Sequence, residues 1–327
     1  MERRAVTIED VAARAGVSIS TVSRVLNDAG YPMRPETRQR VLDAIEELDF
    51  HPSPLARGLL GKPTQTIGLI IPDISNPYYP LLSRGVEDVA SDHGYTVIFC
   101  NTDRSVAKVR RYVEVLREKQ ADGFIFAGGG LEDADEPFPA EELGRKVVLI
   151  GRHRWPFPSI QVDNLRAAYE ATAHLIQLGH RRIAFIGGPA NLSSARDRLR
   201  GYRQAVLELG AAADDALIRE GDFRSQSGYE SALSLLGTPD PPTAIFAAND
   251  RMAIAAMAAA FDAGRRVPQD YVRPSLTTVA LPSYEMGASA ARLLLRLLSG
   301  GATEEVVWLP TRLVVRQSSG EPVHTEP

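Results

Sequence analysis

Apolar residues follow a helical period over residues 1–50 of the chain. They recur three and four positions apart, and no alternating, strand-like run interrupts them. This pattern predicts three short helices, over residues 8–15, 19–26 and 35–48. A short turn containing Gly16 joins the first two, which gives the pair the dimensions of a helix-turn-helix unit.

Capping signals and apolar stripes support these three helices. Thr7 and Asp10 have the spacing of a capping box, Ser18 can cap the second helix, and Pro35 suits the first turn of the third. The side chains expected to face the core of this small region are Ile8, Val11, Ala12, Ala15, Val22, Val25, Leu26, Val41, Leu42, Ile45 and Leu48.

Beyond residue 65 the apolar residues form short continuous runs that alternate with amphipathic stretches. The runs are TIGLIIPDI, YTVIFCNT, DGFIFAGG, KVVLIGR, RRIAFIGG, LIREGD and TAIFAAND, and the amphipathic stretches cover residues 78–93, 105–119, 167–178 and 199–209. Strands that are apolar throughout, each followed by a helix, are typical of parallel sheets covered by helices on both faces. The runs fall into two sets that separate near residues 162–164, which predicts two doubly wound α/β subdomains.

Composition limits where the protein acts. The chain is 44% hydrophobic and 24% charged, as expected of a soluble globular protein. No apolar run reaches the length of a membrane span, and the start, MERRAVTIEDVA, lacks the apolar core of a signal peptide. We therefore expect a cytoplasmic protein with no membrane partner. Cys100 is the only cysteine, and its apolar neighbours indicate a buried, inert thiol.

Net charge does not reveal a nucleic-acid partner. The whole chain carries a charge of −4, and its first 62 residues contain as many basic as acidic side chains. Affinity for a polyanion must therefore come from the local placement of arginines. We find no phosphate-loop, nucleophile-elbow or dinucleotide-binding pattern, and His174 and His180 lack the spacing of a metal pair. We expect no enzyme activity, metal or cofactor.

The second helix presents chemistry that suits DNA. In a helix-turn-helix unit this helix lies in the major groove, with its first residues at the base edges. Arg24 can donate two hydrogen bonds to guanine, and Ile19 can contact a thymine methyl. Small hydroxyl and amide side chains at the helix start can bind phosphates. The candidates for DNA contact in this region are Thr7, Ser18, Ile19, Ser20, Thr21, Ser23, Arg24 and Asn27. On spacing alone, a solvated three-helix bundle remains an alternative.

The stretch VTIEDVAARAGVSISTVSRVLN, followed by RVLDAIEELDFHPSPLARGLLG, resembles the head of the lactose-repressor and galactose-repressor family of bacterial transcriptional regulators. Further motifs of this family follow in order as IGLIIPDISNPYY, VDN, LIQLGHRRIAFIGGP, RLRGYRQAV, FAANDRMAIAAM and RPSLTTV. The resemblance covers nearly the whole chain. It implies a homodimeric repressor of sugar or carbon metabolism genes that binds a near-palindromic operator in double-stranded DNA. A small-molecule effector, such as a sugar or sugar derivative, would modulate it.

The resemblance also implies a role for the segment between head and large domain. Residues 54–60 match a hinge helix that contacts DNA, with Arg57 and Leu59 as candidates and Leu59 wedged into the minor groove. An ordinary flexible linker is the alternative, because prolines and glycines punctuate this segment.

The large region resembles the periplasmic sugar-binding fold, in which a ligand lies in a cleft between two subdomains. Ligands of open parallel sheets bind beyond the carboxyl ends of the strands, where Asp73, Asn101 and Asp250 lie. The residues that the resemblance and this rule propose for effector binding are Asn76, Tyr78, Tyr79, Asp103, Ser194, Arg198, Phe223 and Asn249. Asn76 can equally be a helix cap.

We predict a DNA-binding head over residues 1–50 and a hinge and linker over 51–65. An effector-binding and dimerisation domain covers 66–317, and a disordered tail covers 318–327. The first subdomain of the large domain comprises residues 66–161 with the helix at 284–299, and the second comprises residues 162–276. The helix at 284–298 and the helix after Pro77 are expected to contribute to the dimer face.

The sequence departs from the family after Asp270. About one strand and its turn, with the aspartate that grips the ligand in such proteins, are absent there. Three interpretations of this departure compete. The effector subdomain closes in a different way, the regulator no longer senses a ligand, or the gene product is defective or truncated. A periplasmic-type binding protein and an enzyme of the doubly wound class are the remaining alternatives for the whole chain.

Overall fold

The computed structural model describes residues 6–26, 33–50, 63–129, 146–265, 267, 275–302 and 305–322. Two compact units make up the chain, Met1–Thr64 and Gln65–Pro327.

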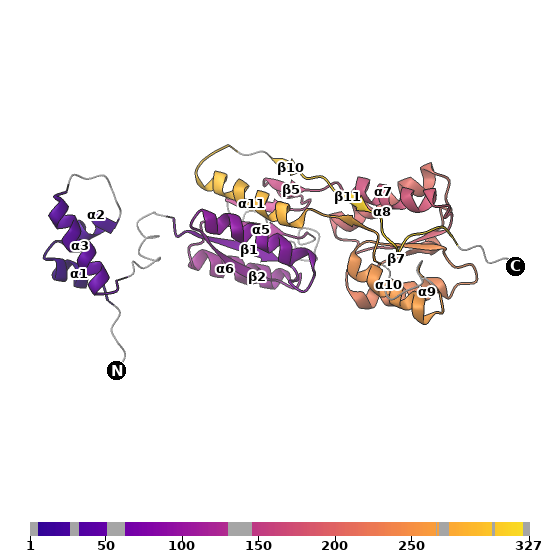
Figure 1. The fold of residues 1–327 in the computed structure, drawn as a ribbon, viewed down its shortest axis with the longest axis horizontal. Coiled ribbons are helices and arrows are strands. Elements are labelled where there is room, and N and C mark those ends of the chain that lie inside the picture. Colours follow the sequence, from indigo (N-terminus) through magenta and orange to yellow (C-terminus); the bar gives the residue numbers. More distant parts are fainter. Residues whose placement is uncertain are drawn as a thin grey trace. The chain divides into compact units, whose positions relative to one another are not determined.

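The first unit contains the three predicted helices, α1 (Ile8–Ala15), α2 (Ile19–Leu26) and α3 (Pro35–Glu47) (Figure 1). Thr7 and Asp10 form the expected capping box, and Gly16 ends α1 with a left-handed φ of 66°. The prediction of three capped helices is therefore confirmed.

The core of this unit differs from the prediction at one position. Val11, Val22 and Val41 are fully buried, but Leu42 is 41% exposed. Ala44 is buried in its place. Neighbouring residues on a helix point about 100° apart, so a stripe through Val41 and Ala44 leaves Leu42 at the edge of the core.

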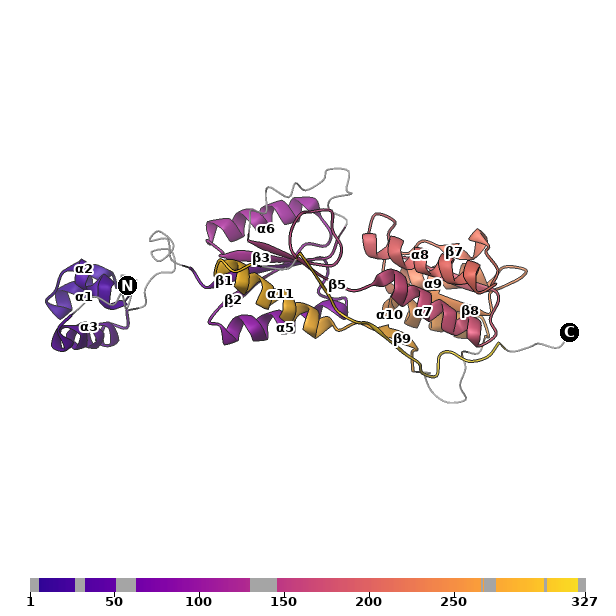
Figure 2. The same cartoon turned by 90° about the horizontal axis from the view of Figure 1, so that it is seen from above.

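The second unit begins with a six-stranded sheet in the order β10-β5-β4-β3-β1-β2, in which every pair is parallel. Its strands are β1 (Thr66–Ile71), β2 (Thr96–Asn101), β3 (Gly123–Ala127), β4 (Val147–Ile150), β5 (Ser159–Gln161) and β10 (Val306–Trp308). Figure 2 shows α6 (Val106–Glu118) on one face of the sheet, and α5 (Tyr78–Asp92) and α11 (Ser283–Leu298) on the other.

Both faces of this sheet are buried, as its continuously apolar strands predict. Along β1, Ile67 and Leu69 belong to the core beneath α5 and α11, whereas Ile70 belongs to the core beneath α6. Cys100 also faces the α6 side, and its burial raises the pKa of the thiol to about 11. The interpretation of Cys100 as a buried thiol is confirmed.

The second subdomain has a three-stranded parallel sheet in the order β7-β6-β8, between two pairs of helices (Figure 1). The elements are α7 (Asn164–Gln177), β6 (Ile183–Ile186), α8 (Ser193–Glu208), β7 (Ile218–Arg219), α9 (Ser225–Leu236), β8 (Ala244–Ala247) and α10 (Asp250–Asp262). Helix α8 begins six residues earlier than predicted. A two-stranded antiparallel pair, β9 (Thr278–Ala280) with β11 (Arg312–Val314), was not predicted.

Strand β8 is an edge of this small sheet in the described part of the chain, and all four of its residues are only partly buried. Residues 268–274, where the departure after Asp270 falls, lie outside the described residues.

The prediction of a disordered tail is wrong for residues 318–322. His174 Nε2 lies 3.0 Å from Ser319 Oγ, and His180 Nε2 lies 2.9 Å from the carbonyl oxygen of Gly320. The polar composition of the tail suggested disorder, but two partly enclosed imidazoles give it specific partners. Residues 323–327 lie outside the described part of the chain.

These histidines predict a loss of stability in mild acid. Burial lowers the pKa of both His174 and His180 in the folded protein. The folded state therefore prefers neutral imidazoles, and its stability falls as the pH drops below the unfolded histidine pKa of about 6.5. Urea unfolding at a series of pH values between about 7.5 and 5 measures this slope. The non-titrating variant His180→Gln should have a shallower slope, and an unchanged slope would exclude His180 as its source.

Candidate functional sites

The start of α2 carries a cluster of hydroxyl groups. Ser18 Oγ lies 2.8 Å from Ser20 Oγ and 2.9 Å from Thr21 Oγ1, and it accepts a hydrogen bond from the Thr21 backbone N–H. Ser18 and Ser20 are exposed, and Thr21 is half-buried. Ser18 therefore caps the helix as predicted, at an end where free backbone N–H groups favour an anion such as phosphate.

The remaining predicted contacts on α2 divide by exposure. Ile19 is 46% exposed, Arg24 is exposed and Ser23 is half-buried, whereas Val22 and Val25 face the core. This places Ile19, Ser20 and Arg24 on the accessible side of the helix.

Three predicted DNA contacts lie outside the described residues, and the side chain of a fourth caps a helix. Asn27, Arg57 and Leu59 are outside the described part of the chain. Thr7 Oγ1 donates to Asp10 Oδ2 at 2.9 Å and accepts from the Asp10 backbone N–H. The Thr7 hydroxyl is therefore already engaged in capping α1.

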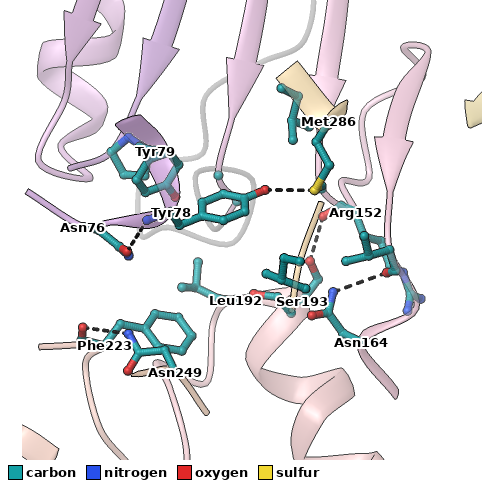
Figure 3. A pocket seen from close by; sticks show the side chains of 18 of the residues that line it. Asn76, Tyr78, Tyr79, Arg152, Asn164, Leu192, Ser193, Phe223, Asn249 and Met286 are labelled. Atoms are coloured by element: carbon teal, nitrogen blue, oxygen red, sulfur yellow. Dashed lines mark hydrogen bonds between the residues drawn. The ribbon is translucent and has the colours of Figure 1, made fainter. Parts of the chain in front are cut away.

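A cavity of about 160 Å³ lies between the two subdomains of the second unit. Every residue predicted to bind effector lines it except Asp103. Figure 3 shows Tyr78 projecting across the cavity toward Met286, with Phe223 and Asn249 on the opposite side. Loops after parallel strands therefore converge here, as the rule for open sheets predicts.

Asp103 is a correction to the predicted site. Its carboxylate forms an ion pair with Lys108 and accepts a hydrogen bond of 2.7 Å from Asn101. It lines a neighbouring pocket together with Asp73. The backbone explains the difference, because Asp103 and Arg104 both adopt a left-handed φ, of 51° and 60°, and the turn brings Arg104 to the cavity wall.

Two tyrosines form an apolar wall of the cavity. The rings of Tyr78 and Tyr79 meet edge to face with centroids 5.0 Å apart, and the Tyr78 hydroxyl contacts Met286 Sδ at 3.4 Å. Burial raises the pKa of both hydroxyls far above the usual value. Both tyrosines therefore remain neutral at physiological pH and offer ring surface and a hydroxyl rather than charge.

The two predicted amide residues also shape the loops. Asn76 Oδ1 accepts from the Tyr78 backbone N–H at 3.1 Å, although the cap residue of α5 is Pro77. Asn249 Oδ1 accepts from Met252 N–H at 3.0 Å, and Asn249 Nδ2 donates to the Phe223 carbonyl at 2.9 Å. Asn249 thereby holds Phe223 in its left-handed conformation, with a φ of 66°.

Sequence reasoning missed several residues of the cavity wall. Arg104, Arg152, Asn164 and Ser193 all line it. Asn164 accepts from Arg198 Nε at 2.9 Å and so orients that guanidinium. Arg104 and Arg152 follow the carboxyl ends of β2 and β4. The rule that selected Asp73 and Asn101 could therefore have selected these arginines too.

The described residues contain no group of three or more histidines, cysteines or acidic side chains that could hold a metal ion. Nor do they contain a helix long and apolar enough to cross a membrane.

Comparison with known proteins decides the family. A family model described as "Bacterial regulatory proteins, lacI family" matches residues 7–53, and one described as "Periplasmic binding protein-like domain" matches residues 172–319. Catabolite control protein A from Priestia megaterium is 39% identical over 336 residues, which cover 96% of this chain and 99% of that relative. The chain belongs to the lacI family of bacterial regulatory proteins.

This LacI-family regulator is similar in structure to relatives that have been solved with ligands bound. The lac repressor dimer bound to operator and the anti-inducer ONPF matches with a TM-score of 0.83 and 28% identity, over 97% of this chain and all of that one. The complex of transcriptional regulator CelR with cellobiose matches with a TM-score of 0.70 and 33% identity, over 96% of this chain and all of that one. The predicted fold, a helix-turn-helix head with a periplasmic-binding-protein-like domain, is confirmed.

Proposed function

We propose that this LacI-family regulator binds a near-palindromic operator as a homodimer and represses genes of sugar or carbon metabolism. The observation that carries the proposal is the accessible face of α2, with Ile19, Ser20 and Arg24, inside the segment that matches the family's DNA-binding head. Two such heads would contact two half-sites of one operator. The protein would act in the cytoplasm as a binding protein rather than an enzyme.

Dimerisation would use the first subdomain of the large unit. Leu81 on α5 and Tyr284 on α11 are exposed, although the two helices bury most of their apolar side chains against each other and the sheet. The proposed hinge contacts, Arg57 and Leu59, would bend the operator centre. That role rests on the family resemblance alone.

A small molecule in the cavity would modulate DNA binding. The cavity wall combines Tyr78 and Tyr79 from the first subdomain with Arg198 and Phe223 from the second. A ligand that contacts both subdomains binds their closed arrangement more tightly, and this difference in affinity sets how far it can shift the protein. The cellobiose complex of a relative supports a sugar or sugar derivative. A regulator that has lost its response to ligands is the second candidate, because β8 is an edge strand of its sheet in the described part of the chain.

Capture of genomic DNA tests the DNA-binding proposal. The purified protein should retain a few palindromic fragments, and sequencing them would identify the operator. Retention should weaken steeply between about 50 and 200 mM salt, because each neutralised phosphate releases counterions. Scrambled fragments of the same length and composition are the control. Equal retention of palindromic and scrambled fragments, or none of either, would refute sequence-specific binding.

A further inference from the structure

The positive charge of the cavity is not balanced within its own wall. Arg104, Arg152 and Arg198 line it, and no aspartate or glutamate is among the described residues of the wall. Asp197 pairs with Arg152, because both of its carboxylate oxygens lie 3.0 Å from Arg152 Nη1, and it also pairs with Arg200. The charges of Arg104 and Arg198 therefore remain to be explained.

These two arginines make polar contacts only with neutral groups among the described residues. Arg104 Nη1 lies 3.4 Å from the Asp222 carbonyl oxygen. Arg198 donates to Asn164 Oδ1 and to the Ala248 carbonyl oxygen. Desolvation lowers the pKa of Arg198, and the charge of Asp250 opposes this shift only in part.

Both guanidinium groups also lie near the same aromatic ring. The Arg104 and Arg198 Cζ atoms are 5.5 and 5.9 Å from the centroid of Phe223. A ring quadrupole attracts a cation but carries no net charge, so the ring does not neutralise either guanidinium group. Arg104 comes from the loop after β2 and Arg198 from α8, so the two cations belong to different subdomains.

The neighbouring pocket, unlike this cavity, has acidic side chains in its wall. It shares Arg104 with the cavity and adds Arg224, Arg251 and three aspartates. The aspartates have donors of their own: Asp73 pairs with Arg251 at 3.4 Å, Asp103 pairs with Lys108, and Asp222 accepts from Ser227. Acidic side chains therefore line the neighbouring pocket but, among the described residues, not this cavity.

We propose that the effector is a small polyol that carries an anionic group, a carboxylate or a phosphate, and that Arg104 and Arg198 bind this group together. The proposal deepens the proposed function and rests on it. Guanidinium forks suit both anions, because each anion presents paired oxygens. An anion placed between the two arginines would attract one cation from each subdomain. Closure would then depend on the charge of the ligand, because a neutral sugar supplies no such attraction.

Matched ligand pairs test the proposal on the full-length protein. Isothermal titration would compare glucose with gluconate and glucose 6-phosphate, and ribose with ribonate and ribose 5-phosphate. At least one acid or phosphate should bind about tenfold or more tightly than its neutral parent, and its affinity should fall with added salt. A preference for the acid or for the phosphate would identify the anion. Binding of a neutral parent as tightly as its anions, or no binding of any anion at about 1 mM, would overturn the proposal.

Variants distinguish binding of the anion by these two arginines from a general effect of positive charge on the protein. Arg104→Gln and Arg198→Gln should each weaken binding of the anion by about tenfold or more, and by a larger factor than they weaken binding of the neutral parent. Arg224→Gln removes the same charge from the neighbouring pocket only and should bind the anion normally. If Arg224→Gln caused an equal loss, the arginine pair would not be the site. Operator retention without ligand, measured on each protein, distinguishes failure of this proposal from failure of the DNA-binding function.

Discussion

Replacing Arg24 with alanine should weaken operator binding by about 1–3 kcal/mol and relax the preference for one base pair in each half-site. Arg24 is exposed on the second helix of the head, where a long side chain can reach a guanine edge. Neither Ile19 nor Ser20 carries such an arm, so direct readout of a purine depends on Arg24. Competition binding with operators substituted at each position measures both effects.

The control for Arg24 is an arginine elsewhere on the same head. Arg40→Ala removes one exposed positive charge from α3 and should leave sequence preference unchanged. A loss that is uniform across all operator variants in Arg24→Ala, together with a smaller salt dependence, would instead identify Arg24 as a phosphate contact.

The head was predictable because its signals are local. The side chains of Thr7 and Asp10, three residues apart, cap each other, and Gly16 is needed where φ is positive. Leu42 was predicted to face the core but is exposed. A periodic pattern locates the centre of a helical apolar stripe better than its edges, and Leu42 lies at an edge.

The cavity was only partly predictable because its chemistry depends on turns. The sequence places Asp103 and Arg104 side by side after β2, and a left-handed conformation at both residues decides which of them reaches the cavity. The partner of Arg152 is Asp197, distant in sequence, so the remaining charge of the wall cannot be read from residue types. The three-residue strands β9 and β11 escape detection since they are too short to show a period.

The junction of α5 and α11 explains how a helix near the end of the chain completes the first subdomain. A Cβ atom added to Gly287 would lie 2.0 Å from the carbonyl oxygen of Leu82, and one added to Gly85 would lie 2.0 Å from that of Tyr284. The two helices therefore touch through their backbones at this pair of glycines. Val86 and Met286 are buried beside the contact.

Gly287→Ala should therefore destabilise the protein, although alanine is the better helix former. Propensity alone would stabilise α11 by about 0.5–1 kcal/mol, whereas a methyl group forced against backbone costs about 1–3 kcal/mol. The net effect should be a melting temperature lower by a few degrees for a unit of this size. Ala107→Gly, at an exposed position of α6, is the control that measures propensity by itself and should also destabilise. A rise in melting temperature for Gly287→Ala would mean that α5 and α11 can separate at no cost, and that their backbone contact does not hold α11 in the first subdomain.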